Sequence, residues 1–231
     1  MTDIKDQLID AALGHVVFDG WSVAAIRAAA NDLEIDTSMA EAFFPRGGVD
    51  LARAFHARGD AEMVAGLQAA DLTEMRFRDR IAFAVRRRLE IVEPHKEAVR
   101  RATTLFALPI YAVDGARAVW ETADAIWDTL GDPSEDYNWY TKRATLTGVI
   151  SSTVLYWLGD QSEDHSASWD FLDRRIDNVM QVEELKANVN DNRYLQPFLA
   201  VPNWVLGQIK PPARAPRADL PGSWSIPGEE G

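Results

Sequence analysis

The sequence predicts an all-α protein in which a short helical module is followed by one larger helical domain. Apolar residues recur with helical spacing along most of residues 3–186, and no segment shows the alternation of a half-buried strand. The chain has 231 residues, 47% of them hydrophobic, and is therefore long enough to bury a core. Glycine and proline separate the periodic blocks at Gly20, residues 45–48, Pro94, Pro109 and residues 131–133.

Three short helices are expected first, over residues 3–18, 22–30 and 37–43. The first is apolar up to Phe18, and Gly20 marks its end. Three short helices that lead into longer ones are typical of a helix-turn-helix module joined to a helical ligand domain.

Longer helices are expected over residues 49–70, 76–92, 95–108, 113–130, 135–158 and 163–186. The second of these has a buried stripe at helical spacing, formed by Phe77, Ile81, Val85, Leu89 and Val92. The last begins after Ser162, a residue suited to an N-cap, and its first turn is acidic.

The charge balance and the lack of cysteine exclude several classes of function. There are 24 basic and 36 acidic residues, a net charge of −12, so a nucleic acid is an unlikely partner unless the basic residues are segregated. Without cysteine there is no disulfide, thiol nucleophile or cysteine-ligated metal. Motifs of metalloproteases, P-loops and nucleophile elbows are also missing. We therefore expect no enzymatic activity, no catalytic residue and no metal.

Two charged clusters have both a functional and a structural interpretation. Asp160, Glu163, Asp164 and His165 could bind a metal, but at a turn before a helix they more often form a solvated helix start. Residues 86–88 are three consecutive arginines, which could form an anion-binding patch. Consecutive helical residues point 100° apart, so a solvated face is favoured for them.

The segment over residues 136–159 is the strongest candidate for a ligand site. Three aromatic residues begin the helix, and residues 144–159 are uncharged and rich in Ser, Thr and Gly. This run is too short and too polar for a membrane span, so it predicts a buried helix. It could be a plain core helix or could leave room for a ligand cavity. In the second case, the expected lining is Leu146, Val149, Ile150 and Val154.

The first 45 residues resemble the start of a TetR-type regulator, including the aromatic pair Phe43-Phe44 before Pro45. The resemblance implies a TetR-like all-α fold. DNA binding is opposed by the charges, since no basic residue lies between Arg27 and Arg46 and four acids surround the third helix.

Longer motifs resemble a second family. This family is the lipid-binding accessory protein of ubiquinone (coenzyme Q) biosynthesis, the ninth protein of that pathway's naming series. The similarity is carried by residues 136–146, 155–165 and 168–176, with Val179-Met180. The resemblance covers most of residues 1–210 and implies a TetR-like fold without DNA binding. It also implies a homodimer, an apolar cavity for an isoprenoid lipid, and a di-iron demethoxyubiquinone hydroxylase as partner. The residues that it places on the partner-facing surface are Asp124, Ile126, Trp127, Trp139 and Tyr140, with Ile126 in place of a family Met.

The segment after residue 192 is expected to form an amphipathic membrane helix. Residues 193–218 hold four basic residues and no acid, which favours an anionic membrane surface. Pro197 and Pro202 would kink such a helix, and docking on protein instead of a membrane stays open. The residues expected to insert are Leu195, Phe198, Leu199, Trp204, Val205, Leu206 and Ile209.

The sequence thus predicts four parts: a helix-turn-helix-like module (1–48), a lipid-binding and dimerisation domain (49–190), a membrane helix (191–210) and a flexible tail (211–231). The expected function is to bind an isoprenoid quinone intermediate, with no other cofactor, and to present it to the hydroxylase. The alternative is a lipid- or drug-responsive regulator of the TetR type. Because the first ten residues hold three aspartates and show no leader, we expect a bacterial, cytoplasmic protein that is peripheral on the inner membrane.

Overall fold

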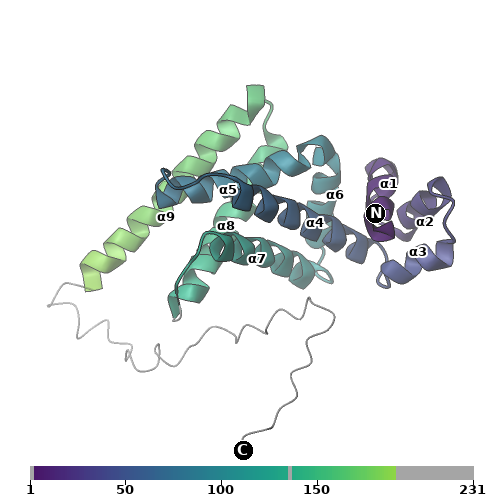
Figure 1. Ribbon diagram of the computed structural model, residues 1–231, viewed down its shortest axis with the longest axis horizontal. Helices are drawn as coiled ribbons and strands as arrows, with labels where there is room; N and C mark the ends of the chain where they lie inside the picture. Colours follow the sequence, from purple (N-terminus) through teal and green to yellow (C-terminus); the bar gives the residue numbers. More distant parts are fainter. Residues whose placement is uncertain (1–2, 135–136, 191–231) are drawn as a thin grey trace, which may run out of the picture.

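The computed structural model describes residues 3–134 and 137–190, and all the secondary-structure elements in these ranges are helical, which confirms the predicted class (Figure 1). The N-terminal module is formed by α1 (Ile4–Asp19), α2 (Val23–Asp32) and α3 (Thr37–Phe43). The larger domain is formed by α4 (Gly48–Ala69), α5 (Phe77–Val92), α6 (Lys96–Phe106), α7 (Ala112–Thr129), α8 (Tyr137–Gly159) and α9 (Ser166–Asn190).

Most helices begin and end within one or two residues of the predicted positions, and polar caps explain several starts. The side chains of Asp3, Ser22 and Asp36 accept hydrogen bonds from backbone N–H groups in the first turns of α1, α2 and α3. Two predicted helices begin differently, because short 3₁₀ turns, Glu93–His95 and Glu163–His165, precede α6 and α9.

The N-terminal module and the larger domain share one hydrophobic core. Residues from α1, α2 and α3 lie in the same buried cluster as residues from α4, α5, α6 and α8. Trp21, just before α2, donates a hydrogen bond from Nε1 to the Ala98 carbonyl at 3.0 Å, and its ring lies 5.4 Å from that of Phe55. A Cβ atom at Gly48 would lie 1.9 Å from the Trp21 carbonyl oxygen, so only glycine permits this close approach.

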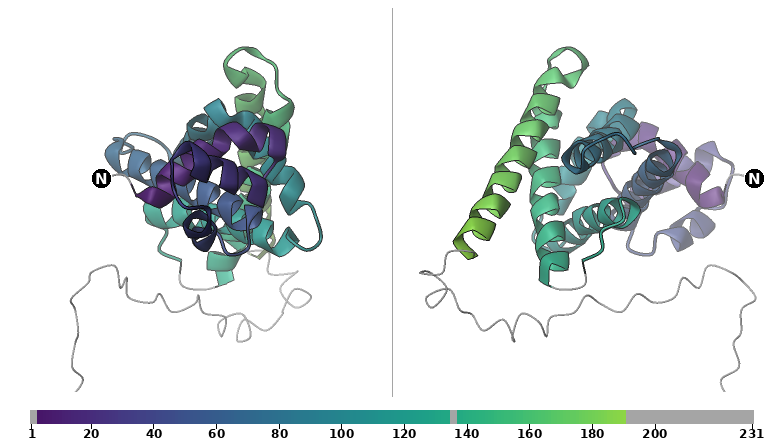
Figure 2. Two further views of the ribbon diagram at one scale, coloured as in Figure 1. Left: turned by 90° about the vertical axis from the view of Figure 1, so that its right-hand side faces the viewer. Right: turned by 60° about the vertical axis from the view of Figure 1, so that its left-hand side comes forward.

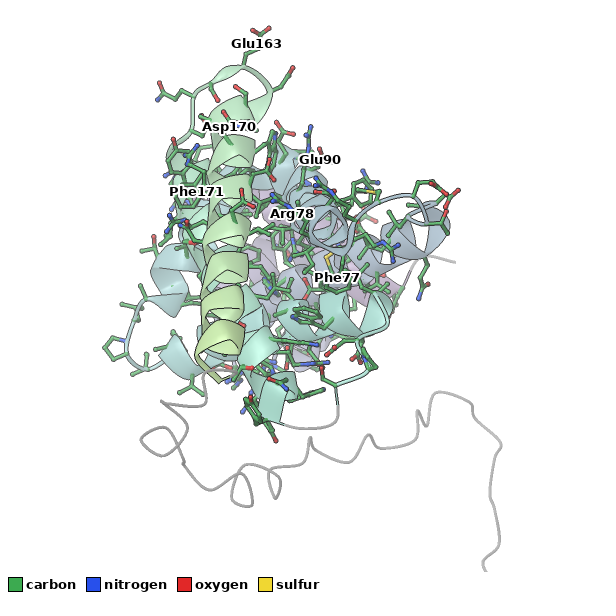
Figure 3. All side chains as sticks on the ribbon, turned by 90° about the vertical axis from the view of Figure 1, so that its left-hand side faces the viewer. Phe77, Arg78, Glu90, Glu163, Asp170 and Phe171 are labelled. Atoms are coloured by element: carbon green, nitrogen blue, oxygen red, sulfur yellow. The ribbon has the colours of Figure 1, made fainter. Side chains whose placement is uncertain are left out.

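A second buried cluster holds the other end of the domain together, with residues from α4, α5, α7, α8 and α9. Figure 2 shows α9 lying along α8, at the opposite end of the molecule from α1–α3. Arg78 on α5 forms an ion pair with Asp177, and Phe171 stacks on Tyr156 with ring centroids 4.5 Å apart (Figure 3). Phe77, predicted to be buried, is 42% exposed because it begins α5, although it packs against Trp127.

Among the described residues, no helix combines the length and the hydropathy that a membrane span requires. The seven residues predicted to insert into a membrane, from Leu195 to Ile209, lie outside the described residues.

Candidate functional site

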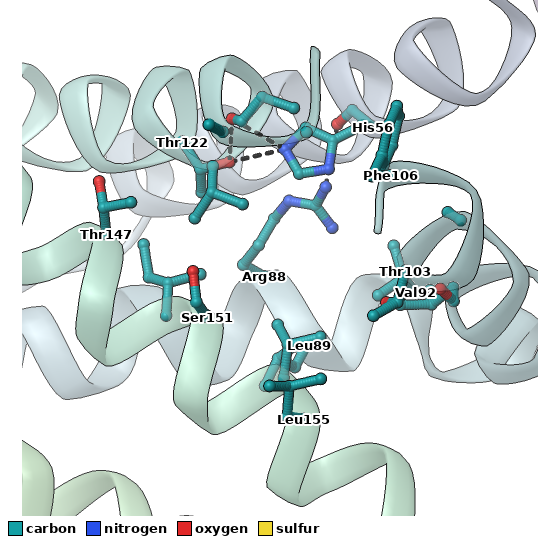
Figure 4. Close-up of a pocket in the computed structure, with 18 of the residues that line it drawn as sticks. His56, Arg88, Leu89, Val92, Thr103, Phe106, Thr122, Thr147, Ser151 and Leu155 are labelled. Atoms are coloured by element: carbon teal, nitrogen blue, oxygen red, sulfur yellow. Dashed lines mark hydrogen bonds between the residues drawn. The ribbon is translucent and has the colours of Figure 1, made fainter. Parts of the chain in front are cut away.

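A largely apolar cavity of about 510 Å³ lies among α4, α5, α6, α7 and α8 (Figure 4). Its volume is within the range of about 300–1,000 Å³ that is usual for small-molecule sites. Three of its lining residues, Ala107, Ala116 and Leu155, are exposed, so the cavity opens between the end of α6, the start of α7 and the middle of α8. The apolar side chains of the wall include Phe55, Val85, Leu89, Val92, Phe106, Val119, Ile126, Ile150 and Val154.

Two of the four residues predicted to line the cavity do so. Ile150 and Val154 face it, together with Thr147, Ser151 and Leu155 of the same face of α8. Leu146 and Val149 do not line it, and this part of the prediction is wrong. These two side chains lie on the neighbouring face of α8 and are buried in the second core cluster, because successive helical residues point 100° apart.

A polar cluster lies on one side of this apolar cavity, formed by His56 and Asp60 of α4, Arg88 of α5 and Thr122 of α7. Arg88 donates from Nε to the Asp60 carboxylate at 2.6 Å and from Nη2 to the His56 carbonyl at 2.9 Å. Thr122 Oγ1 lies 3.0 Å from Asp60 Oδ1 and 2.8 Å from His56 Nε2. The hydrogen bonds thus join three helices at the cavity wall (Figure 4).

Burial lowers the pKa of His56, and this effect outweighs the opposing attraction of Asp60. The imidazole is therefore neutral at neutral pH. The cluster has no net charge, because the guanidinium of Arg88 is balanced by the carboxylate of Asp60.

Sequence reasoning missed this cluster and placed Arg88 on a solvated face, which is wrong because Arg88 is only 7% exposed. Two signals in the sequence could have identified it. His56 and Asp60 are four residues apart on one helix, and Arg88 follows Val85 by three residues, in register with the buried stripe.

The predicted partner-facing surface contains a second buried guanidinium. Arg143 on α8 is fully buried and forms ion pairs with Asp124, Asp128 and Asp132 at the end of α7 and the following turn. Its guanidinium carbon lies 3.9 Å from the centre of the Trp139 ring. Asp124, which the resemblance assigned to a partner, is thus already paired within the chain.

The structure corrects part of that surface. Ile126 is fully buried and Trp127 is 8% exposed, because both face the second core cluster, so they offer little surface to a partner. Trp139 is 9% exposed and packs against the Tyr140 ring, with centroids 4.8 Å apart. Tyr140 is half-buried and Asp124 is partly exposed, so these two remain accessible.

The N-terminal module lacks the free cations that DNA binding needs near its third helix. Arg27, before α3, is paired with Glu41 at 2.6 Å. Arg46, after α3, is paired with Asp50 and with Asp114. The acidic residues around α3 are thus not offset by unpaired arginines on either side of it.

The residues Asp160 to His165 form a helix start. Asp160 accepts hydrogen bonds from the backbone N–H of Ser162 and from the hydroxyl and N–H of Ser168, and the Ser168 hydroxyl is the main reason that the pKa of Asp160 is well below its usual range. Ser162 Oγ accepts from the Ala167 N–H at 3.0 Å, but it makes no capping hydrogen bond to the turn Glu163–His165 that it precedes, so it is not the N-cap that the sequence predicts. Within the described ranges, no group of His, Asp and Glu side chains has the arrangement of a metal site.

The fold defines the class of protein first. A TetR transcriptional regulator from Nitrosomonas europaea superposes on this structure with a TM-score of 0.63, over 76% of this chain and 96% of the other. Its sequence is 18% identical, so this similarity shows a TetR-like fold alone.

The sequence comparisons then identify the family resemblance. Residues 112–183 match the family model described as COQ9. The mitochondrial ubiquinone biosynthesis protein COQ9 of Drosophila melanogaster is 35% identical, with 78% of this chain and 56% of the relative aligned. That of Rattus norvegicus is 32% identical, over 78% of this chain and 59% of the relative. The resemblance to the COQ9 family of ubiquinone biosynthesis is therefore confirmed, although this chain spans little more than half the length of these relatives.

The expected location is contradicted by the same comparisons. The relatives in Drosophila melanogaster, Rattus norvegicus and Dictyostelium discoideum are named mitochondrial, which contradicts the expectation of a bacterial cytoplasmic protein. The expectation depended on the first ten residues. Because the aligned region covers only 56 to 64% of the relatives, the start of this sequence is no guide to a leader.

Proposed function

We propose that this protein binds an isoprenoid quinone intermediate of ubiquinone biosynthesis and presents it to the di-iron demethoxyubiquinone hydroxylase, without catalysing a reaction itself. The observation that carries the proposal is the open, largely apolar cavity of about 510 Å³, in a chain that resembles ubiquinone biosynthesis proteins. Burial of one isoprene unit, with about 100 Å² of apolar surface, contributes roughly 2.5 kcal/mol before entropic losses.

Presentation of a lipid requires contact with the hydroxylase and with the membrane. The accessible side chains of Tyr140 and Asp124, close to the start of α8, support a contact with the hydroxylase at this end of the domain. The cationic segment over residues 193–210 supports binding to an anionic membrane surface.

A homodimer is also part of the proposal. Leu155 and Tyr156 on α8 are 60% and 41% exposed, which is high for large apolar side chains. Ala144 and Gly148, two to three turns before them, are also exposed and are small enough for a second helix to approach closely. An α8 face of this kind supports contact with a second copy of the chain.

Lipid extraction from the purified full chain tests the proposal. We expect mass spectrometry to detect a prenylated ring compound at a ratio near one per chain, and we expect the delipidated protein to gain thermal stability when a short-chain quinone is added. The proposal would be contradicted if the purified protein retained no such lipid and the delipidated protein gained no thermal stability from the quinone. A gel-shift assay at low salt addresses the regulator alternative, for which sequence-specific DNA binding is the required result.

A further inference from the structure

The hydrogen bonds of the polar cluster determine which nitrogen of His56 carries the proton. Thr122 Oγ1 lies within 3.1 Å of both carboxylate oxygens of Asp60, and a carboxylate in an ion pair only accepts hydrogen bonds. The Thr122 hydroxyl therefore donates to Asp60, and its oxygen must accept from His56 Nε2 at 2.8 Å. The Ala118 carbonyl, 3.1 Å from the same nitrogen, is also an acceptor. Both contacts require a proton on Nε2.

The other nitrogen, Nδ1, is then a lone-pair acceptor. Burial keeps the ring neutral by lowering its pKa, so the lone pair is not lost to a second proton. The hydrogen bonds that the His56 side chain makes to described residues all use Nε2. The His56 side chain is 25% accessible although it lies inside the domain, because it lines the cavity. Nδ1 is not fully enclosed by the protein, which leaves it some accessible surface.

We propose that His56 Nδ1 accepts a hydrogen bond from a hydroxyl group of the bound lipid, so that the cavity binds the isoprenoid intermediate more tightly in its phenol or hydroquinone form than in its quinone form. A quinone or an ether cannot donate to this nitrogen. A fatty acid would bring a negative charge to a cluster whose own charge is already balanced by the pair between Arg88 and Asp60. The apolar wall and the opening beside Leu155 accommodate the tail (Figure 4). This inference rests on the proposed function, since it names the head group of the same ligand.

Two ligands that differ by one hydrogen-bond donor test the proposal: 2-farnesylphenol and its methyl ether, each titrated into the delipidated full chain. One buried hydrogen bond predicts that the phenol binds about 3- to 10-fold more tightly than the ether. In His56→Phe this preference should disappear, with little change in the affinity for the ether. The matched control is His15→Phe, because His15 is paired with Asp32 on the N-terminal module and does not line the cavity.

The outcomes separate the two proposals. If neither ligand binds the wild-type chain, the proposed function fails. If both ligands bind equally to the wild type, or if the preference for the phenol survives in His56→Phe, the head-group assignment is overturned while lipid binding stands. Should His56→Phe fail to fold, Thr122→Val serves instead. This variant removes the nearer of the two acceptors that hold the His56 proton on Nε2, so the preference for the phenol should decrease, and an unchanged preference in Thr122→Val would count against the assignment.

Discussion

Replacement of Arg143 by methionine is expected to destabilise the domain strongly. Arg143 is fully buried, and Asp132, one of its three partners, is only 1% exposed at the side chain. Methionine has a similar length, so the cost arises from lost pairing and not from a void. Removal of one partner of a buried ion pair typically costs about 3–5 kcal/mol, because the remaining charge stays buried.

The three aspartates that pair with Arg143 contribute unequally to this loss of stability. Asp124 and Asp128 are 38% and 40% exposed, so their pairs with Arg143 are partly screened by solvent and are worth about 1 kcal/mol or less each. Asp132 retains Lys142 at 2.7 Å after the substitution, which limits the loss. We therefore expect Arg143→Met to lower the free energy of unfolding by about 3 to 5 kcal/mol. Most of this loss comes from the buried pair with Asp132 and from the repulsion among the three carboxylates that remain clustered.

Urea unfolding followed by circular dichroism measures this change, and thermal unfolding should show a decrease of roughly 6–20 °C in the midpoint. The control is Arg86→Met. Arg86 forms a partly exposed pair with Glu90 within α5, and its guanidinium carbon lies 4.9 Å from the centre of the Trp169 ring, so this variant should lose at most about 1 kcal/mol. A loss below about 1 kcal/mol in Arg143→Met would refute the view that this guanidinium holds α7 and α8 together.

The same cluster gives a pH dependence. Burial by itself raises the pKa of Asp132, but hydrogen bonds from Lys142 and Ser134 outweigh it, so the pKa lies below its usual value. A carboxyl group with a lowered folded pKa stabilises the protein fully above its unfolded pKa near 4, and this stabilisation is lost as the pH falls through the folded pKa. The free energy of unfolding of the wild type should therefore decrease as the pH is lowered below about 4. In Asp132→Asn the free energy of unfolding should decrease less steeply at acid pH than in the wild type. An equally steep decrease would contradict the conclusion that Asp132 is the source of this pH dependence.

Three further predictions concern binding. Val154→Phe, which fills the cavity from α8, should abolish retention of the extracted lipid without lowering stability by more than about 1 kcal/mol, and undiminished retention would argue against this cavity as the site. Tyr140→Ala should weaken capture of the hydroxylase by about 2 kcal/mol, about 30-fold, while the melting temperature stays near that of the wild type, and equal capture would remove Tyr140 from the contact surface. A chain that ends at Asn192 should keep its helical content but lose co-sedimentation with anionic liposomes, and co-sedimentation equal to that of the full chain would disprove the membrane assignment.

The helices were predictable because each one has an apolar stripe and a glycine, proline or polar cap at its ends. The hydrogen bonds among the buried polar residues could not be predicted in the same way, because the residues that form them are distant in the sequence. Arg88 and His56 meet across two helices, and Arg143 bonds to carboxylates 11 to 19 residues before it. A charged residue is normally assigned to the surface from its type, and only the register of the buried stripe indicates otherwise. Periodicity located α8 correctly but could not determine which of its faces, that of Ser151 or that of Val149, contacts the cavity.

The close contact between Gly48 and Trp21 has a consequence for how this architecture tolerates change. Because the indole of Trp21 is anchored to α6 and the module's side chains complete the core of the larger domain, residues 1–48 do not form a separable folding unit. Deletion of the module would leave Phe55 and Trp157 without part of their packing and would expose apolar surface to aggregation. A helix-turn-helix-like module can thus be retained for packing alone, since the larger domain would lose part of its hydrophobic core without it.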